Sequence, residues 1–131
     1  HRQRPGIYIE VWGDPVTTVG GGTFLSDIVQ LAGGRNIGSG LKTRYPHVSA
    51  EWIITENPDV ILCAYMLPSA SPVKAIAQRP GWGRMKAVAR NAICADIPPD
   101  LLLRPGPRMI DGAKAFQEWL ERWVESTPAQ P

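Results

Sequence analysis

Apolar runs alternate with amphipathic segments along almost the whole chain, and this alternation constrains the fold more than any other feature. Residues 59–64 are dominated by the continuous apolar run Val-Ile-Leu-Cys-Ala, typical of a strand buried on both faces. Segments 7–12 and 92–97 also predict strands. The predicted helices are 24–32, 49–57 and 71–78, a helical turn at 85–89 and a last helix from about 107 to 123.

This order of elements predicts an α/β fold. We expect a three-layer sandwich in which helices cover both faces of a small, mostly parallel central sheet. The length of 131 residues fits one such unit, spanning residues 1–131, and excludes two complete domains. Gly and Pro number 13 each, which indicates a turn-rich globular chain.

Charge and hydropathy argue against a nucleic-acid partner and against a membrane-spanning helix. The formal net charge is +2, from 14 basic and 12 acidic residues, and no long basic cluster occurs, so we expect no nucleic-acid binding. The longest apolar run, 60–67, is far shorter than the roughly 20 residues that a membrane helix needs.

The two cysteines predict little redox or metal chemistry. Cys63 and Cys94 each lie inside an apolar run, where a thiol behaves as a small hydrophobic side chain. The two histidines, His1 and His47, pair with no Cys or carboxylate at the spacing of metal ligands. We therefore expect buried thiols and no metal site.

Signatures of an enzyme are sparse. The glycines at 20–22 lie between a strand and a helix, but their spacing matches no dinucleotide fingerprint and favours a turn that permits close approach. His47 stands near Ser49, which is better explained as a helix N-cap. Asp14 and Asp96 follow strands and could act as general bases or cap turns.

Ligands of such sheets bind outside the carboxyl ends of the strands. The loops expected there are 13–23, 44–49, 65–71 and 98–108. In the last of these, prolines stiffen the backbone between Arg104 and Arg108. Arg108 would stand in the first turn of the final helix, against the helix dipole, which favours a functional role; a solvated arginine or a salt bridge to Asp111 explains it equally well.

Three further residues lie at or near this edge. Tyr45 precedes Pro46 in a polar loop and suits either a stacking platform or packing beneath the loop. Glu51 belongs to the first turn of its helix, where an acidic side chain is favourable. Trp12 ends the first strand and is interpreted as a core or rim residue.

Several motifs follow one another in a specific order. They are 8–15, the glycine turn with Phe24-Leu25, 31–37 (LAGGRNI), 45–51 (YPHVSAE), 57–62 (NPDVIL), 79–82 (RPGW) and 104–108 (RPGPR). In this order and spacing the chain resembles, over about residues 7–123, the C-terminal lobe of the periplasmic binding proteins that serve ABC importers of iron-siderophores and vitamin B12.

The resemblance implies two α/β lobes joined by a long helix, with the ligand between them. The sequence corresponds to one lobe, without the N-terminal lobe and linking helix. The implied function is capture of cobalamin or a related corrinoid and its delivery to a membrane permease, without catalysis or a resident cofactor. A ferric siderophore or haem is the alternative ligand, and a sensor domain or a small α/β enzyme the alternative function. The implied location is periplasmic or extracytoplasmic, with an upstream lipid anchor as one option.

The resemblance also implies roles for single residues. Tyr45 matches a position that is aromatic and contacts ligand in the family's cobalamin binder, and Arg108 matches an arginine at the cleft. Arg104 shares the loop of Arg108. Thr17 occupies another cleft position that is aromatic in that protein, and this departure leaves the ligand open. Glu51 matches the surface glutamate that docks the lobe onto the permease.

Overall fold

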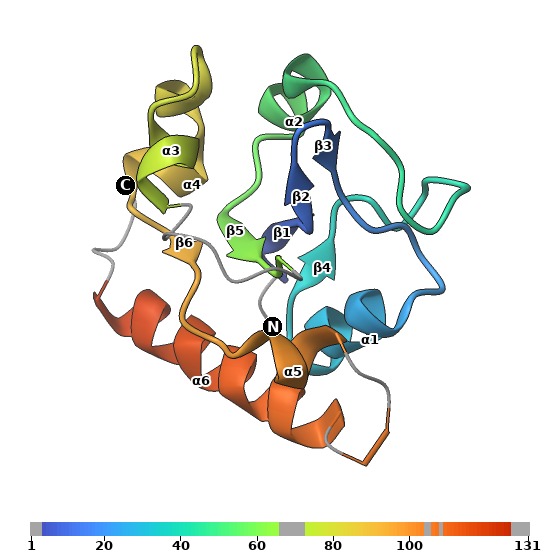
Figure 1. Ribbon diagram of the computed structural model, residues 1–131. Helices are drawn as coiled ribbons and strands as arrows, with labels where there is room; N and C mark the ends of the chain where they lie inside the picture. Colours follow the sequence, from blue (N-terminus) through green and yellow to red (C-terminus); the bar gives the residue numbers. More distant parts are fainter. Residues whose placement is uncertain (1–3, 66–72, 104–105, 108, 127–131) are drawn as a thin grey trace.

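A four-stranded parallel sheet lies at the centre of the computed structural model, which describes residues 4–65, 73–103, 106–107 and 109–126 (Figure 1). Its strand order is β4-β1-β5-β6. The strands are β1 (Gly6–Glu10), β4 (Arg35–Asn36), β5 (Val60–Cys63) and β6 (Ile93–Cys94). A separate antiparallel pair comprises β2 (Trp12–Gly13) and β3 (Val16–Thr17).

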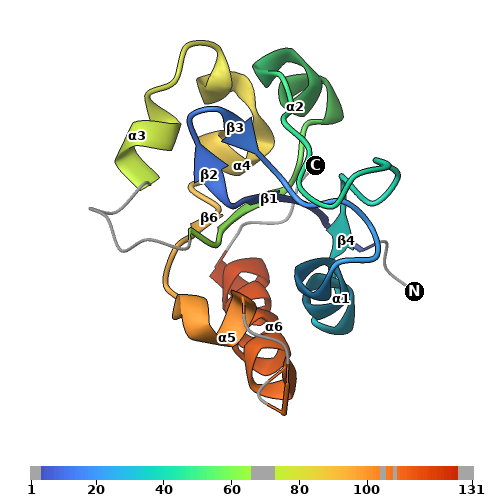
Figure 2. The same ribbon diagram turned by 45° about the vertical axis from the view of Figure 1, so that its right-hand side comes forward.

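Helices cover both faces of this sheet. They are α1 (Phe24–Leu31), α2 (Ala50–Glu56), α3 (Val73–Ala77), α4 (Lys86–Ala89), α5 (Pro99–Leu103) and α6 (Met109–Ser126), with a 3-10 turn η1 (Trp82–Arg84). In both views α1, α5 and α6 lie on one side of the sheet, and α2, α3 and α4 on the other (Figures 1 and 2). The predicted three-layer α/β sandwich is confirmed.

Two hydrophobic cores follow from the alternation of side chains along β1. Ile7 and Ile9 point to the side of α1 and α6, where Phe116 is fully buried with them. Tyr8 points to the opposite side and packs in the second core with Trp82. Each layer of helices therefore has its own buried apolar contact with the sheet.

The topology places a switch point at the carboxyl ends of β1 and β5. These two strands are hydrogen-bonded neighbours, with Ile7 opposite Val60 and Glu10 opposite Cys63. The chain leaves β1 toward β4 on one side, through α1, and leaves β5 toward β6 on the other. Neighbouring parallel strands whose connections diverge form a topological switch point, where α/β proteins bind ligands.

The main helix boundaries agree with the sequence prediction. The side chain of Thr23 caps α1 by accepting from Ser26 N at 3.2 Å, and Ser49 caps α2 by accepting from Trp52 N at 3.0 Å. Asn57, in the left-handed conformation with φ 48°, ends α2 before Pro58.

Other boundaries differ from the prediction. The strand expected at 92–97 extends only over β6, and the strand expected at 7–12 breaks after Glu10. No sequence pattern predicts β4, a short edge strand with the polar sequence Arg35-Asn36. α5 lies within the predicted loop 98–108 and begins at Pro99, a first helical position at which proline costs a helix little.

The expected burial of the thiols is confirmed. Cys63 and Cys94 are both free and buried, and burial raises the pKa of each to about 12. Within the described part of the chain, no helix is long and apolar enough to cross a membrane. Among the same residues, no three His, Cys, Asp or Glu side chains are grouped as a metal site would require.

Candidate functional site

A buried carboxylate occupies the carboxyl end of β1, at the switch point. Glu10 is fully buried, and its Oε1 accepts hydrogen bonds from Tyr8 Oη and Arg79 Nη1, both at 2.7 Å. Its Oε2 accepts from Arg79 Nη2 at 2.9 Å and from Tyr65 Oη. The four donors match the four acceptor positions of a carboxylate, so this group is completely satisfied. We name Glu10, Arg79, Tyr8 and Tyr65 the Glu10 cluster.

The aromatic ring of Trp82 completes the surroundings of Arg79. The guanidinium carbon lies 4.6 Å from the centre of the Trp82 ring, a cation–π contact. The Tyr8 ring meets Trp82 edge-on, with centroids 6.0 Å apart. Arg79 is therefore held both by its charge partner and by a buried aromatic ring.

The pKa values of Tyr8, Tyr65 and Arg79 follow from burial and from the charge of Glu10. Burial, the Glu10 charge and its hydrogen bond all raise the pKa of Tyr8 well above the usual value. Burial and the hydrogen bond to Glu10 likewise raise the pKa of Tyr65. For Arg79, burial lowers the pKa, but the hydrogen bonds and charge of Glu10 outweigh it and the net shift is upward. Both phenols stay protonated and Arg79 stays charged at physiological pH.

One member of the cluster, Tyr65, also belongs to an aromatic pair. Tyr65 follows β5, and its ring centre is 5.9 Å from that of Trp12, at an interplanar angle of 46°. Trp12 is 41% exposed. The predicted core or rim place of Trp12 is thus a partly exposed one, and no sequence pattern predicts Glu10, Arg79 and Tyr65 as partners. One signal was available: Tyr8 and Glu10, two residues apart, must share a face of a strand that is buried on both faces.

The β2–β3 hairpin aligns Trp12 with two other residues. Thr17 lies opposite Trp12 in the antiparallel pair, and a further antiparallel bridge joins Thr17 to His47. Directly opposed residues of antiparallel strands project on the same face, so Trp12, Thr17 and His47 share one face. Thr17 itself is only 8% exposed, and its hydroxyl donates to Pro15 O at 2.8 Å.

The loop that carries Tyr45 is fixed to this hairpin. Thr18 N donates to Pro46 O at 3.1 Å, and Gly20 N to Arg44 O at 2.8 Å. A Cβ at Gly20 would collide with the Thr43 carbonyl oxygen. The close approach that glycine permits at this turn is therefore the approach of another loop of the same chain. Tyr45 stands 58% exposed on it.

The remaining predicted residues lie apart or outside the described residues. Glu51 is exposed in the first turn of α2, next to the cap formed by Ser49. Arg104 and Arg108 lie outside the described residues. Thr17 and the Tyr45 loop are thus brought together, while Glu51 lies in the first turn of a separate helix.

The candidate enzymatic groups form no catalytic arrangement among the described residues. The Ser49 hydroxyl is engaged as a cap, and Asp14 and Asp96 are exposed on separate loops.

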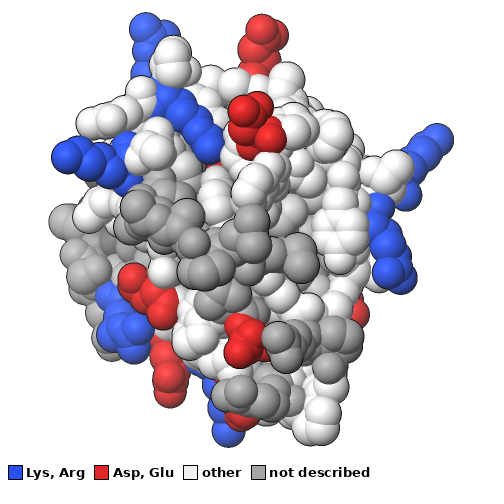
Figure 3. All heavy atoms as spheres, viewed as in Figure 1, with Lys and Arg blue, Asp and Glu red and all other residues white. Residues whose placement is uncertain are grey.

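Figure 3 shows Lys and Arg side chains at separated places round the margin of one face rather than as a single basic field.

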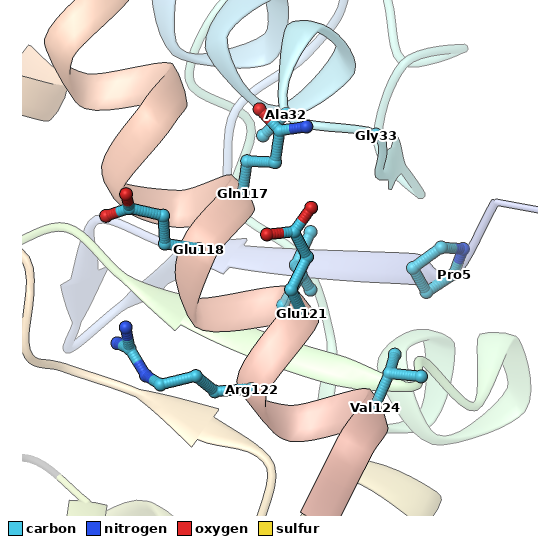
Figure 4. A pocket seen from close by; sticks show the side chains of 9 residues that line it. Pro5, Ala32, Gly33, Gln117, Glu118, Glu121, Arg122 and Val124 are labelled. Carbon is cyan, nitrogen blue, oxygen red and sulfur yellow. The ribbon is translucent and has the colours of Figure 1, made fainter.

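An open hollow of about 700 Å³ lies away from the Glu10 cluster (Figure 4). It is lined by Pro5, which precedes β1, by Gly33 at the end of α1, and by α6 side chains that include Glu118, Glu121 and Arg122. Pro5 and Gly33 belong to the amino ends of β1 and β4, so this hollow is at the opposite edge of the sheet from the Glu10 cluster.

Comparison with known proteins agrees with the topology. Residues 3–100 match the family model described as periplasmic binding protein. Over 117 residues the chain is 30% identical to an uncharacterized ABC transporter substrate-binding lipoprotein of Bacillus subtilis, covering 88% of this chain and 35% of that protein.

Two solved structures are also similar. A protein of Staphylococcus epidermidis, described as a possible iron-binding (periplasmic solute-binding) protein, superposes with a TM-score of 0.78 at 28% identity, over 92% of this chain and 46% of that one. The periplasmic vitamin B12 binding protein of Vibrio cholerae gives 0.74 at 26% identity, over 95% and 47%. The chain spans less than half the length of each of these relatives. With its doubly wound sheet and the family match over most of its length, the chain belongs to the periplasmic binding protein family.

Proposed function

We propose that this chain is one ligand-binding lobe of the substrate-binding component of an ABC importer, and that its ligand is cobalamin or a related corrinoid. The observation that carries the proposal is the aromatic surface at the switch point, where exposed Trp12 lies beside Tyr65 above a fully satisfied buried carboxylate. The similarity to a vitamin B12 binding protein supports the ligand class.

The lobe acts by binding alone. It forms one wall of a cleft, and a second, N-terminal lobe supplies the other. Exposed Tyr45, on its fixed loop, stacks against the ligand, while Arg104 and Arg108 donate hydrogen bonds to its polar rim. Thr17 contributes space beside Trp12, and its hydroxyl can accept but not donate a hydrogen bond, because its proton is already donated to Pro15 O. No bond is made or broken and no cofactor is needed.

Delivery requires contact with a membrane permease. Glu51 suits this role because it is exposed at the start of α2, beyond the cap of Ser49. The protein works outside the cytoplasm, in the periplasm or at the cell surface, where a lipid anchor would hold it near the permease. The lipoprotein relative supports this location.

Calorimetric titration of the full-length protein that carries this chain tests the proposal. Cyanocobalamin should give saturable one-to-one binding, and this chain alone should bind more weakly because it provides half of the contacts. Haemin and a ferric hydroxamate chelate are the comparison ligands. Saturable binding of either of these without binding of cyanocobalamin would reject the corrinoid and select the alternative class.

A further inference from the structure

The orientation of Trp12 is fixed although its ring is exposed. Its indole Nε1 donates to Asp14 O at 2.9 Å, and its ring rests beside that of Tyr65. The polar atom of the side chain is therefore satisfied within the chain, and what faces outward is apolar aromatic surface. A large apolar side chain in this state is typical of a contact surface.

Tyr65 is held in turn by the carboxylate beneath it. Its hydroxyl donates to Oε2 of Glu10, one of four hydrogen bonds that this fully buried group accepts. Rotation of Tyr65 away from its position would leave a buried carboxylate oxygen short of a donor, which is costly. The position of the ring beside Trp12 is thus coupled to Glu10.

The cluster joins three parts of the chain at one point. Glu10 ends β1, Tyr65 follows β5, and Arg79 belongs to the turn before η1. A Cβ at Gly13 would lie 2.9 Å from Tyr65 Oη and 3.1 Å from Arg79 Nη2, so the backbone of β2 closes directly over the cluster. Buried ion pairs contribute little net stability compared with apolar packing, whereas they do fix geometry.

We propose that Trp12 and Tyr65 form a ligand-contacting aromatic pair, and that Glu10 is the positioning residue that fixes this pair. The ligand class it suits is a flat macrocycle or chelate with an apolar face. The proposal rests on the proposed function and deepens it, because it assigns ligand contact to these two rings and names the internal residue that orients them.

Ligand contact is tested with Trp12→Ala and Trp12→Phe in the full-length protein, by calorimetry with cyanocobalamin and haemin. Trp12→Ala should weaken binding of the recognised probe about tenfold or more, as expected for loss of an aromatic contact, and Trp12→Phe should restore most of it. Leu31→Ala is the matched control, because Leu31 is an exposed apolar residue of α1. It should bind as the wild type does.

Positioning is tested with Glu10→Gln and Tyr65→Phe. Each should weaken binding severalfold, and each should weaken it less in the Trp12→Ala background than in the wild type, because part of its effect passes through the contact with Trp12. Asp59→Asn is the control for loss of a structural carboxylate, since Asp59 accepts from Gly6 N and pairs with Lys86 at the opposite edge of the sheet. If Glu10→Gln does not fold, Tyr65→Phe decides alone.

A measurement without ligand completes the test. The near-ultraviolet circular dichroism of Trp12 is obtained as the spectrum of a protein minus that of the same protein with Trp12→Phe. This difference should change in the Tyr65→Phe background and stay unchanged in the Asp59→Asn background. An unchanged signal overturns positioning. If Trp12→Ala binds the probe as tightly as the wild type does, ligand contact by Trp12 is overturned while the proposed function stands. Binding of neither probe by the wild type rejects both the ligand class and the contact role.

Discussion

The guanidinium of Arg79 binds both carboxylate oxygens of Glu10, with Nη1 2.7 Å from Oε1 and Nη2 2.9 Å from Oε2. The two residues are 69 positions apart in the sequence. Parallel bonds of this kind constrain direction as well as distance. The contact therefore ties the turn before η1 to the carboxyl end of β1, at the edge where the proposed ligand binds.

Arg79→Met should lower the free energy of unfolding by about 3–5 kcal/mol, because it leaves the buried carboxylate of Glu10 without its cation. Urea denaturation followed by circular dichroism measures this. The control is Lys86→Met, which breaks the more exposed pair with Asp59, 3.2 Å long, and should cost about 0–1 kcal/mol. Equal losses in the two variants would contradict the special role of the buried pair.

Stability should fall as the pH rises above about 9, because folding raises the pKa of four groups that lose their protons near this pH in the unfolded chain. Tyr8 and Tyr65 ionise near pH 10 when unfolded, and Cys63 and Cys94 near pH 9, but all four hold their protons to higher pH when folded. The unfolded chain then binds fewer protons than the folded one. Alkali therefore favours unfolding, by up to about 1.4 kcal/mol per pH unit for each group.

The measurement is urea denaturation at pH 8, 10 and 11. Tyr65→Phe removes one of the two phenols and should flatten the decline between pH 10 and 11, even though it lowers stability at pH 8. A decline as steep as that of the wild type would show that Tyr65 does not retain its proton through folding.

Gly20→Ala should destabilise the loop that carries Tyr45. The added methyl group would collide with the Thr43 carbonyl oxygen, a backbone atom that cannot move alone, at an expected cost of about 1–3 kcal/mol. Hydrogen exchange should accelerate at the amides of Thr18 and Gly20, which donate to the loop. Gly40→Ala is the control, because no atom lies within 4 Å of a Cβ at Gly40.

Glu51→Ala should leave ligand affinity unchanged and reduce ligand uptake by cells. Glu51 is exposed, so its removal should cost the helix only about 0.3–1 kcal/mol through the lost interaction with the dipole. Uptake of labelled cyanocobalamin measures the effect. Glu56→Ala, at the other end of α2, should transport normally. Normal transport by Glu51→Ala would contradict the docking role.

Local sequence patterns were sufficient for the larger elements of the fold. The run Val60–Cys63 predicted a central strand because a strand covered on both faces needs apolar side chains in succession. Ser49 and Asn57 predicted the limits of α2 because capping depends on nearby backbone groups. Patterns failed at Arg35-Asn36, since an edge strand of two polar residues owes its geometry to pairing with β1.

The sequence by itself determined the α/β class, the limits of α2, the buried thiols and the edge of the sheet at which loops gather, because these depend on local spacing and on the period of side chains. Only the tertiary structure decided that Glu10 faces inward and meets Arg79, and that Tyr65 lies beside Trp12. A buried carboxylate needs a cation from somewhere in the chain, but residues 69 positions apart are selected by the packing of β1, β5 and η1, which no local pattern encodes.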